Sequence, residues 1–239
     1  MAVQRPLVRA PKSSPDRQPM NALNFQPRPG AACRVLCLGA HSDDIEIGCG
    51  GLILSLIGNR KAVDIDWVVF SAAGARELEA RRSAGLFLKG ARRTRIITKQ
   101  FRDGFFPYEG GDIKTVFEEL KKETNPDLVL THYRDDRHQD HRVLSDLTWN
   151  TFRDHFVLEY EIPKFDGDLG QPNCFMPLTK SLCARKSKYL ETAFSTQRDK
   201  HWFSSETFMG LMRLRGMECR APGGYAEAFY GRKVALNFG

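Results

Sequence analysis

Two short clusters of histidine and aspartate have the residue types needed to bind a metal ion and activate water. They are His41-Ser42-Asp43-Asp44 and His138-Gln139-Asp140-His141. Two imidazoles and one carboxylate are a common donor set for zinc in hydrolases, but the same set suits the Fe(II) of non-haem oxygenases. An additional aspartate beside the ligands favours hydrolysis, because it can act as the base for an attacking water. The clusters therefore predict a metal-dependent enzyme.

The segments around the clusters alternate between buried strands and amphipathic helices. Apolar runs predict strands at 34–39, 65–71, 94–98 and 127–131, and helical patterns cover 48–58, 76–89 and the segment with Val116, Phe117 and Leu120. Strands that alternate with helices require right-handed crossovers. We therefore predict a Rossmann-like three-layer α/β/α sandwich with a mostly parallel sheet. Both clusters then fall at the carboxyl edge of the sheet, where such folds bind ligands.

The last third of the chain is less regular. The pattern predicts a helix from His141 to about His155, a strand at 156–162, helices at 179–194 and 206–214, and a short strand at 225–230. Two long loops, at 99–111 and 163–173, could form walls of a substrate cleft or be ordinary surface connections.

Composition points to one folded domain with an N-terminal extension. Of the 12 prolines, six lie in the first 30 residues, together with five basic residues and one acidic residue. We expect residues 1–31 to be a disordered Pro/Arg-rich extension and residues 32–239 to form a single α/β domain. The extension also carries much of the net charge of +7. The remainder is close to balance, so we expect no nucleic-acid partner.

Cysteine usage and hydropathy indicate a cytoplasmic protein. The six cysteines form no CxxC pair and no dense disulfide framework, which is typical of reduced thiols. No apolar run approaches the roughly 20 residues that cross a bilayer, and no apolar signal-peptide core follows the N-terminus. We therefore expect no membrane span. The sequence leaves a homo-oligomer open.

The two clusters resemble the paired motifs of the LmbE-like or PIG-L family of metal-dependent N-deacetylases, A-H-P-D-D-x-E followed by glycines and H-x-D-H. Here the first motif is Ala40–Glu46 with Gly48, Gly50 and Gly51, and the second is His138–His141. Further similarity lies at Arg76 and Glu79 and at Tyr225–Phe229. Ser42 replaces the usual proline, which frees φ but removes no functional group.

The resemblance implies a zinc ion, or another divalent metal, bound by His41, Asp44 and His141. It also implies that Asp43 is the general base and that His138 is an acid or electrostatic partner. Asp140 would hold His138 charged and oriented. The implied reaction removes an N-acetyl group from an N-acetylglucosamine-like sugar or glycoside, and this small molecule is the expected partner.

Several roles and rival functions stay open at this stage. Four residues could bind substrate or serve the structure, namely Glu46, Arg76, Arg137 and Glu227, and three aromatic residues could stack on a sugar or simply pack, namely Tyr108, Trp202 and Phe203. The substrate could be another N-acyl or thiol-linked glucosamine conjugate. A non-haem Fe(II) enzyme and a non-catalytic nucleotide-binding module are the rival classes. The module is disfavoured because the glycines lack G-x-G-x-x-G spacing and follow acidic groups that repel phosphate.

Overall fold

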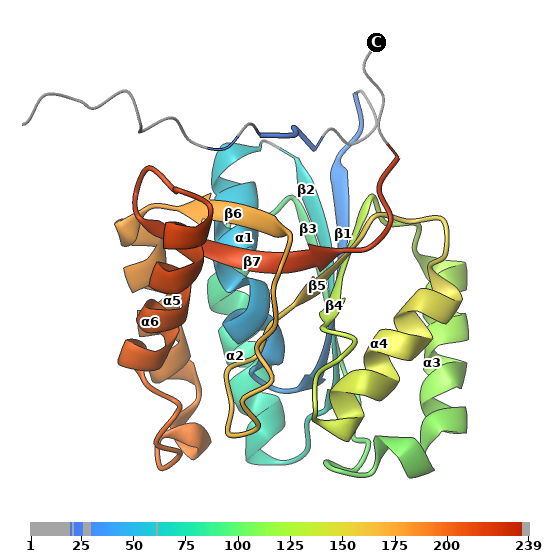
Figure 1. The fold of residues 1–239 in the computed structure, drawn as a ribbon. Helices are drawn as coiled ribbons and strands as arrows, with labels where there is room; N and C mark the ends of the chain where they lie inside the picture. The colour runs from blue at the N-terminus through green and yellow to red at the C-terminus, as the bar shows by residue number, and fades with distance from the viewer. Residues whose placement is uncertain (1–19, 21, 26–29, 61, 236–239) are drawn as a thin grey trace, which may run out of the picture.

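The computed structural model describes residues 20, 22–25, 30–60 and 62–235. Within them, one sheet of seven strands has the order β3-β2-β1-β4-β5-β7-β6 (Figure 1). Five strands are parallel: β1 (Cys33–His41), β2 (Val63–Ser71), β3 (Arg93–Thr98), β4 (Leu128–His132) and β5 (Val157–Tyr160). Two more extend the sheet in the antiparallel sense: β7 (Tyr225–Gly231) and β6 (Cys174–Leu178). The sheet confirms the predicted mostly parallel α/β fold.

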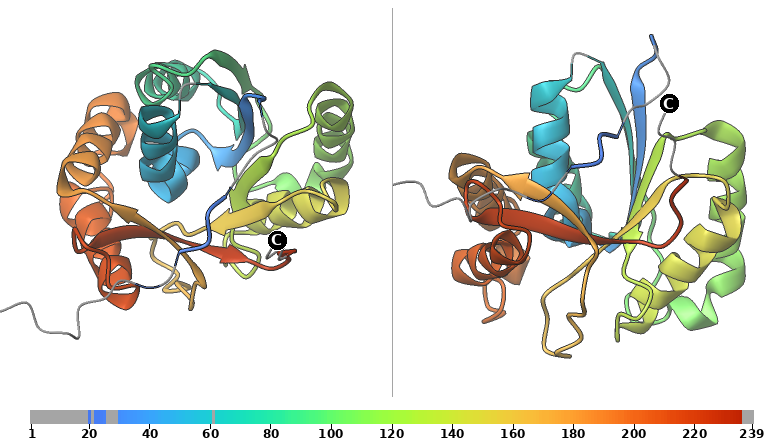
Figure 2. Two further views of the ribbon diagram at one scale, coloured as in Figure 1. Left: turned by 90° about the horizontal axis from the view of Figure 1, so that it is seen from above. Right: turned by 45° about the horizontal axis from the view of Figure 1, so that its top comes forward.

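Helices cover both faces of the sheet (Figures 1 and 2). One face carries α1 (Asp44–Asn59), α2 (Ala75–Phe87), α5 (Lys180–Ala193) and α6 (Ser205–Glu218), and the other carries α3 (Gly110–Glu123) and α4 (Gln139–Thr151). Two short 3-10 helices, Phe106–Tyr108 and Ser195–Gln197, lie in the connections. Successive side chains of a strand point to opposite faces. Trp67 and Phe70 of β2 accordingly belong to separate buried clusters, one under each helical layer.

The strand order changes direction at β1, and this position matters for the site. The chain passes from β1 through α1 to β2 on one side, whereas β4 pairs with the other side of β1. In open α/β sheets, ligands bind beyond the carboxyl ends of the strands at such a switch point. Here those ends are His41 of β1 and His132 of β4.

Helix α1 begins at Asp44, four residues before the predicted start at Gly48. Glycines disfavour a helix interior, yet three of them lie inside α1, at 48, 50 and 51. The structure shows what they provide: a Cβ on Gly48 would lie 2.1 Å from the ring of Tyr160. Backbone angles depart from helical values at Cys49, so α1 is kinked there. The glycines thus allow close packing of α1 on the sheet.

The C-terminal part differs from the prediction in two strands. The strand predicted at 156–162 is shorter, Val157–Tyr160, and strand β6 was not predicted at all. Pro177 lies within β6, and proline is tolerated in a sheet only at an edge, which is where β6 lies. The predicted extension, residues 1–31, lies largely outside the described residues, so the division into an extension and a single domain stays a prediction.

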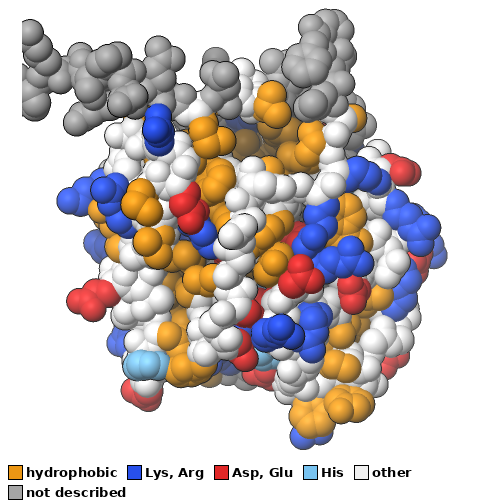
Figure 3. Space-filling view, viewed as in Figure 1, with side chains coloured by type: hydrophobic (Ala, Val, Ile, Leu, Met, Phe, Trp, Pro, Cys, Tyr) orange, Lys and Arg blue, Asp and Glu red, His pale blue; other side chains and the backbone are white. Residues whose placement is uncertain are grey.

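The described surface carries charges of both signs. On the face shown in Figure 3, Lys and Arg side chains lie among Asp and Glu side chains. Arg232, for example, lies 2.6 Å from Glu159 and 3.6 Å from Asp135. None of the helices in the described part of the chain is long and apolar enough to cross a membrane.

Candidate metal centre

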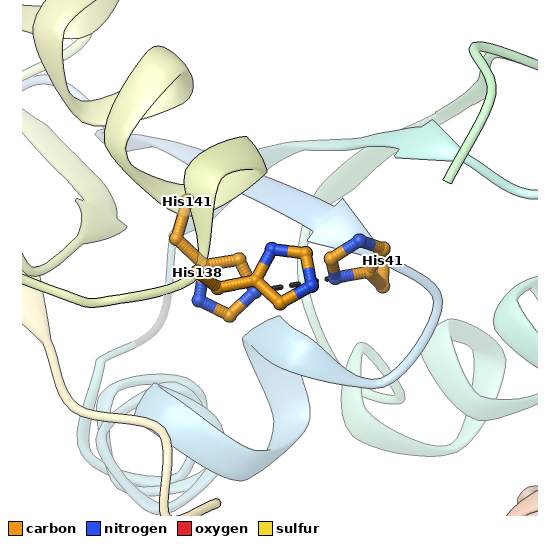
Figure 4. A group of neighbouring side chains, drawn as sticks. All are labelled: His41, His138 and His141. Atoms are coloured by element: carbon orange, nitrogen blue, oxygen red, sulfur yellow. Dashed lines mark hydrogen bonds between the residues drawn. The ribbon is translucent and has the colours of Figure 1, made fainter. Parts of the chain in front are cut away.

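The first cluster occupies the turn between β1 and α1. His41 is the last residue of β1 and Asp44 is the first residue of α1. The backbone N–H of His41 donates to Oδ2 of Asp44 at 2.6 Å, which fixes the carboxylate beside the imidazole. The second cluster begins α4, and Figure 4 shows the rings of His138 and His141 reaching from this helix toward His41.

Three donor atoms converge at the switch point. Nδ1 of His41, Oδ2 of Asp44 and Nε2 of His141 are separated by 3.3, 3.5 and 3.2 Å (Figure 4 shows the two imidazoles). A tetrahedral zinc ion with bonds of about 2.0–2.1 Å spaces its ligands by roughly 3.3 Å. The three residues predicted as ligands therefore fit around one such ion.

Asp136, which the sequence did not single out, orients His141. Its Oδ2 accepts a hydrogen bond from Nδ1 of His141 at 2.9 Å, and its Oδ1 accepts from the backbone N–H of His138 at 2.8 Å. Lys164 lies 3.0 Å from the same Oδ1. A carboxylate on one ring nitrogen fixes the tautomer, so the lone pair of Nε2 faces the candidate metal position.

Asp140 has partners beyond the one predicted. Its Oδ2 lies 3.1 Å from Nε2 of His41, and the carboxylate also accepts from the backbone N–H groups of Gly104 at 2.6 Å and Phe106 at 3.1 Å. Toward His138 it is the backbone N–H of Asp140 that donates, to the ring Nδ1 at 3.3 Å. The carboxylate of Asp140 therefore hydrogen-bonds His41 and the loop at Gly104, and its expected role of holding His138 charged and oriented stays a prediction.

His138 caps the N-terminus of α4 through the same hydrogen bond. Its ring centroid lies 4.8 Å from that of His41 and 4.6 Å from that of His141. Because Nδ1 accepts a hydrogen bond, Nε2 is the nitrogen that can carry a proton. Burial and the neighbouring His41 lower the pKa of His138 below its usual value.

Asp43 lies next to the donor triangle and pairs with an arginine from α2. Nη2 of Arg76 donates to Oδ1 of Asp43 at 2.9 Å, and only 4% of Asp43 is exposed. Burial raises the pKa of Asp43, and the guanidinium of Arg76 opposes this shift. The structure thus brings Arg76, an open candidate, to the site as the partner of the predicted base.

The electrostatics of two corners of the triangle, Asp44 and His141, suit a cation, whereas at His41 the neighbouring carboxylates outweigh burial and raise the pKa well above its usual value. Burial works against the charged form of Asp44, yet His141, His132 and His41 together hold its pKa well below the usual range. Burial and the neighbouring His132 lower the pKa of His141 to about 3, so its ring is neutral and its nitrogen can donate electrons to a metal. Metal binding requires these ionisation states of carboxylate and imidazole.

His132 is a further histidine at the site. Its Nε2 lies 3.2 Å from Oδ2 of Asp44 and accepts the backbone N–H of Ala40 at 2.9 Å. The ring stacks on His141 with centroids 3.9 Å apart. Because Nε2 of His132 accepts the backbone N–H of Ala40, its lone pair is not free to bind a metal, and the ring packs against the imidazole of His141. Its signal in the sequence was the group of three histidines within residues 132–141.

Two of the open carboxylates, Glu46 and Glu227, are buried. Both oxygens of Glu227 accept backbone N–H groups of α1, from Gly51 and Leu52 at 2.6 Å each, and Lys186 lies 2.7 Å from Oε1. This contact is about two helical turns along α1 from Asp44. Glu46 is fully buried, and burial raises its pKa well above the usual range. The geometry gives Glu227 a structural role.

Of the remaining candidates for substrate contacts, Arg137 and Tyr108 are exposed and Phe203 is buried. Arg137 is exposed, and its backbone N–H donates to Asp168 at 2.7 Å. Tyr108 is 84% exposed, whereas Phe203 is buried beside Phe208. The two predicted cleft loops both reach the site's supporting groups: loop 99–111 through its contacts with Asp140, and loop 163–173 through its contact with Asp136.

Comparison with known proteins agrees with this site. The family model for PIG-L, described as GlcNAc-PI de-N-acetylase, matches residues 36–152, about half of the chain, and this segment contains both clusters. Among curated proteins none matches the chain in sequence.

Several solved structures share the fold. N,N'-diacetylchitobiose deacetylase from Pyrococcus horikoshii is 22% identical, with 86% of each chain covered and a TM-score of 0.65. The zinc-inhibited form of the teicoplanin deacetylase Orf2 is 15% identical, with 82% of this chain and 97% of that chain covered and a TM-score of 0.64. The 4-carboxy-2-hydroxymuconate hydratase GalB from Pseudomonas putida is 17% identical, with 87% and 100% covered and a TM-score of 0.63.

At these identities the structural likeness establishes the fold, and the match to the family model establishes the family. Both motifs of the sequence lie inside the matched segment, and the structure joins them at one edge of the sheet. Over residues 36–152, the chain belongs to the PIG-L (LmbE-like) family of N-deacetylases.

Proposed function

We propose that this enzyme is a zinc-dependent hydrolase that removes the N-acetyl group from an N-acetylglucosamine-like amino sugar or glycoside. The observation that carries the proposal is the donor triangle of His41, Asp44 and His141, with sides of 3.2–3.5 Å and an aspartate beside it. A zinc ion bound there would polarise an amide carbonyl and lower the pKa of a water to about 7.

Asp43 is the residue we assign as general base. It lies in the turn between His41 and Asp44 and is held by Arg76, so its carboxylate has a fixed orientation. A base held this way can take a proton from water as the water attacks the carbonyl carbon. Arg76 is the positioning residue, since it acts through Asp43.

We assign His138 to the leaving amine and to the amide oxygen of the substrate. Its Nε2 can carry a proton, while Nδ1 is occupied by the cap of α4. An amine leaves poorly unless it is protonated, and to supply that proton from Nε2, His138 would first need a second proton on Nδ1, in place of the cap hydrogen bond. The same N–H could donate to the negative charge that develops on the amide oxygen.

The choice of substrate rests on the family and on the titles of the related structures. One is a deacetylase of diacetylchitobiose and another is a teicoplanin deacetylase, whereas the hydratase shows that this fold also supports other chemistry. An N-acetylated amino sugar or glycoside is our first proposal, and another N-acyl or thiol-linked glucosamine conjugate is the second choice within the same reaction. All six cysteines are free, which supports a reducing, cytoplasmic setting.

The direct test is metal-dependent release of acetate. The protein is stripped with a chelator, reloaded with zinc or with Fe(II) under anaerobic conditions, and incubated with N-acetylated sugars, glycosides and thiol-linked N-acetylglucosamines. We expect acetate and a free amine in equal amounts only in the reloaded samples. Release by the stripped protein, or turnover that requires oxygen and a reductant, would contradict the proposal.

A further inference from the structure

A buried lysine in the loop 163–173 joins this loop to the segment that precedes α4. Nζ of Lys164 lies 3.0 Å from Oδ1 of Asp136 and also bonds Oδ2 of Asp168. The Lys164 side chain is 8% exposed, and the side chains of the two aspartates are 2% and 6% exposed. Two buried carboxylates therefore share one ammonium group.

Both carboxylates hold residues of the segment that carries the second motif. Oδ2 of Asp136 accepts the hydrogen bond from Nδ1 of His141 at 2.9 Å. Oδ2 of Asp168 accepts the backbone N–H of Arg137 at 2.7 Å. Lys164 thus contacts both carboxylates that fix this segment, and through Asp136 it reaches the ring of His141.

We propose that Lys164 is a positioning residue that acts on His141 through Asp136 and thereby strengthens metal binding at the donor triangle. The inference rests on the proposed function, because it takes His141 as a metal ligand. Like charges repel strongly where water is excluded, so Asp136 and Asp168 would move apart without the ammonium group that they share. Asp136 would then hold the imidazole of His141 less firmly, and Nε2 of His141 would be aimed less well at the metal position.

The test compares zinc affinity in Lys164→Met, Asp136→Asn and the double variant. Affinity is measured on stripped protein by competition with a chromophoric chelator. A carboxylate that orients a metal-bound histidine contributes about 10- to 100-fold, and a residue that acts through it contributes less, so we expect Lys164→Met to weaken zinc binding about 3- to 30-fold. In the Asp136→Asn background the same substitution should change the affinity less than about twofold, because the partner through which it acts is already altered.

Lys186→Met is the matched control. Lys186 is also a buried lysine bound to a carboxylate, since its side chain is 3% exposed and Nζ lies 2.7 Å from Oε1 of Glu227. Glu227 bonds the backbone of α1 and no histidine of the triangle, so this variant should keep zinc affinity within about twofold. If Lys164→Met fails to fold, Lys164→Gln replaces it; this variant keeps an N–H donor without the charge and should weaken zinc binding at least about threefold.

A second readout needs no metal. In the stripped protein, long-range proton–nitrogen correlation spectra of the histidine rings report which ring nitrogen carries the proton. His141 should carry it on Nδ1 in the wild type, because that nitrogen donates to Asp136. Lys164→Met should show a mixture of the two tautomers, whereas Lys186→Met should keep the wild-type spectrum.

The results separate this inference from the proposed function. Zinc affinity within about twofold of the wild type, with an unchanged tautomer of His141, in folded Lys164→Met would overturn the inference and leave the hydrolase intact. An equal loss of affinity in Lys186→Met, or a loss that simply adds to that of Asp136→Asn, would also overturn it. A wild type that binds no zinc, but in which the tautomer of His141 depends on Lys164, would overturn the proposed function and leave Lys164 as the residue that positions His141.

Discussion

Replacing Asp136 by asparagine tests whether the carboxylate behind His141 tunes the metal site. The change keeps the size of the side chain but removes its charge, and the side chain is 2% exposed. It weakens the hydrogen bond from Nδ1 of His141, 2.9 Å long, and removes a charge 3.0 Å from Lys164. His141 then becomes a poorer donor and its ring is held less firmly.

The expected loss follows from this single contact. Carboxylates that orient metal-bound histidines contribute about 10- to 100-fold to metal affinity. This corresponds to about 1.4–2.7 kcal/mol of binding free energy. Zinc affinity is measured by competition with a chromophoric chelator, with circular dichroism of the stripped protein as a check on folding. Asp135→Asn is the neighbouring control, and it should bind zinc as the wild type does.

Two results would refute the reasoning. If folded Asp136→Asn binds zinc within about twofold of the wild type, the carboxylate does not act through His141. Asp135 does not contact the ligand histidines in the described structure. If Asp135→Asn nevertheless loses as much zinc affinity as Asp136→Asn, the loss comes from removing a negative charge near the site and not from the hydrogen bond to His141.

Three other predictions, the last with a control substitution, concern catalysis and packing. Asp43→Asn should keep the bound zinc but lower kcat at least about 100-fold, because the base is lost, and metal content measured beside turnover checks this. Lys186→Met should lower the free energy of unfolding in urea by about 3–5 kcal/mol, because it leaves the buried carboxylate of Glu227 without its cation; a loss below about 1 kcal/mol would show the pair to be dispensable. Gly48→Ala should destabilise by about 1–3 kcal/mol through its clash with a tyrosine ring, whereas Gly58→Ala meets nothing within 4 Å and should be neutral or stabilising.

The fold and the meeting of the two clusters at one sheet edge could be predicted from the sequence because both depend on local patterns. Apolar runs followed by helices define β1 and β4, and parallel strands bring their carboxyl ends to one edge. His41 and His141 therefore converge although they are 100 residues apart. Strand β6 escaped prediction because an edge strand with a proline has a weak pattern.

The supporting residues could not be predicted in the same way. The family resemblance assigned Asp140 to His138, and the motif gives no sign that the carboxylate also bonds His41 and the backbone of Gly104. Asp136 reads as an ordinary residue before a helix, and its role appears only from its contacts with His141 and Lys164. Tertiary contacts of this kind leave no periodic signal in the chain.

The metal content of the untreated protein tests the central claim most directly. Protein purified without added metal and freed of loosely bound ions by gel filtration is analysed for all transition metals, alongside Asp44→Ala, His141→Ala and Asp43→Asn. We predict one zinc per chain in the wild type and in Asp43→Asn, and little metal in the two ligand variants. Iron in place of zinc, or equal metal loss in Asp43→Asn and Asp44→Ala, would contradict the account.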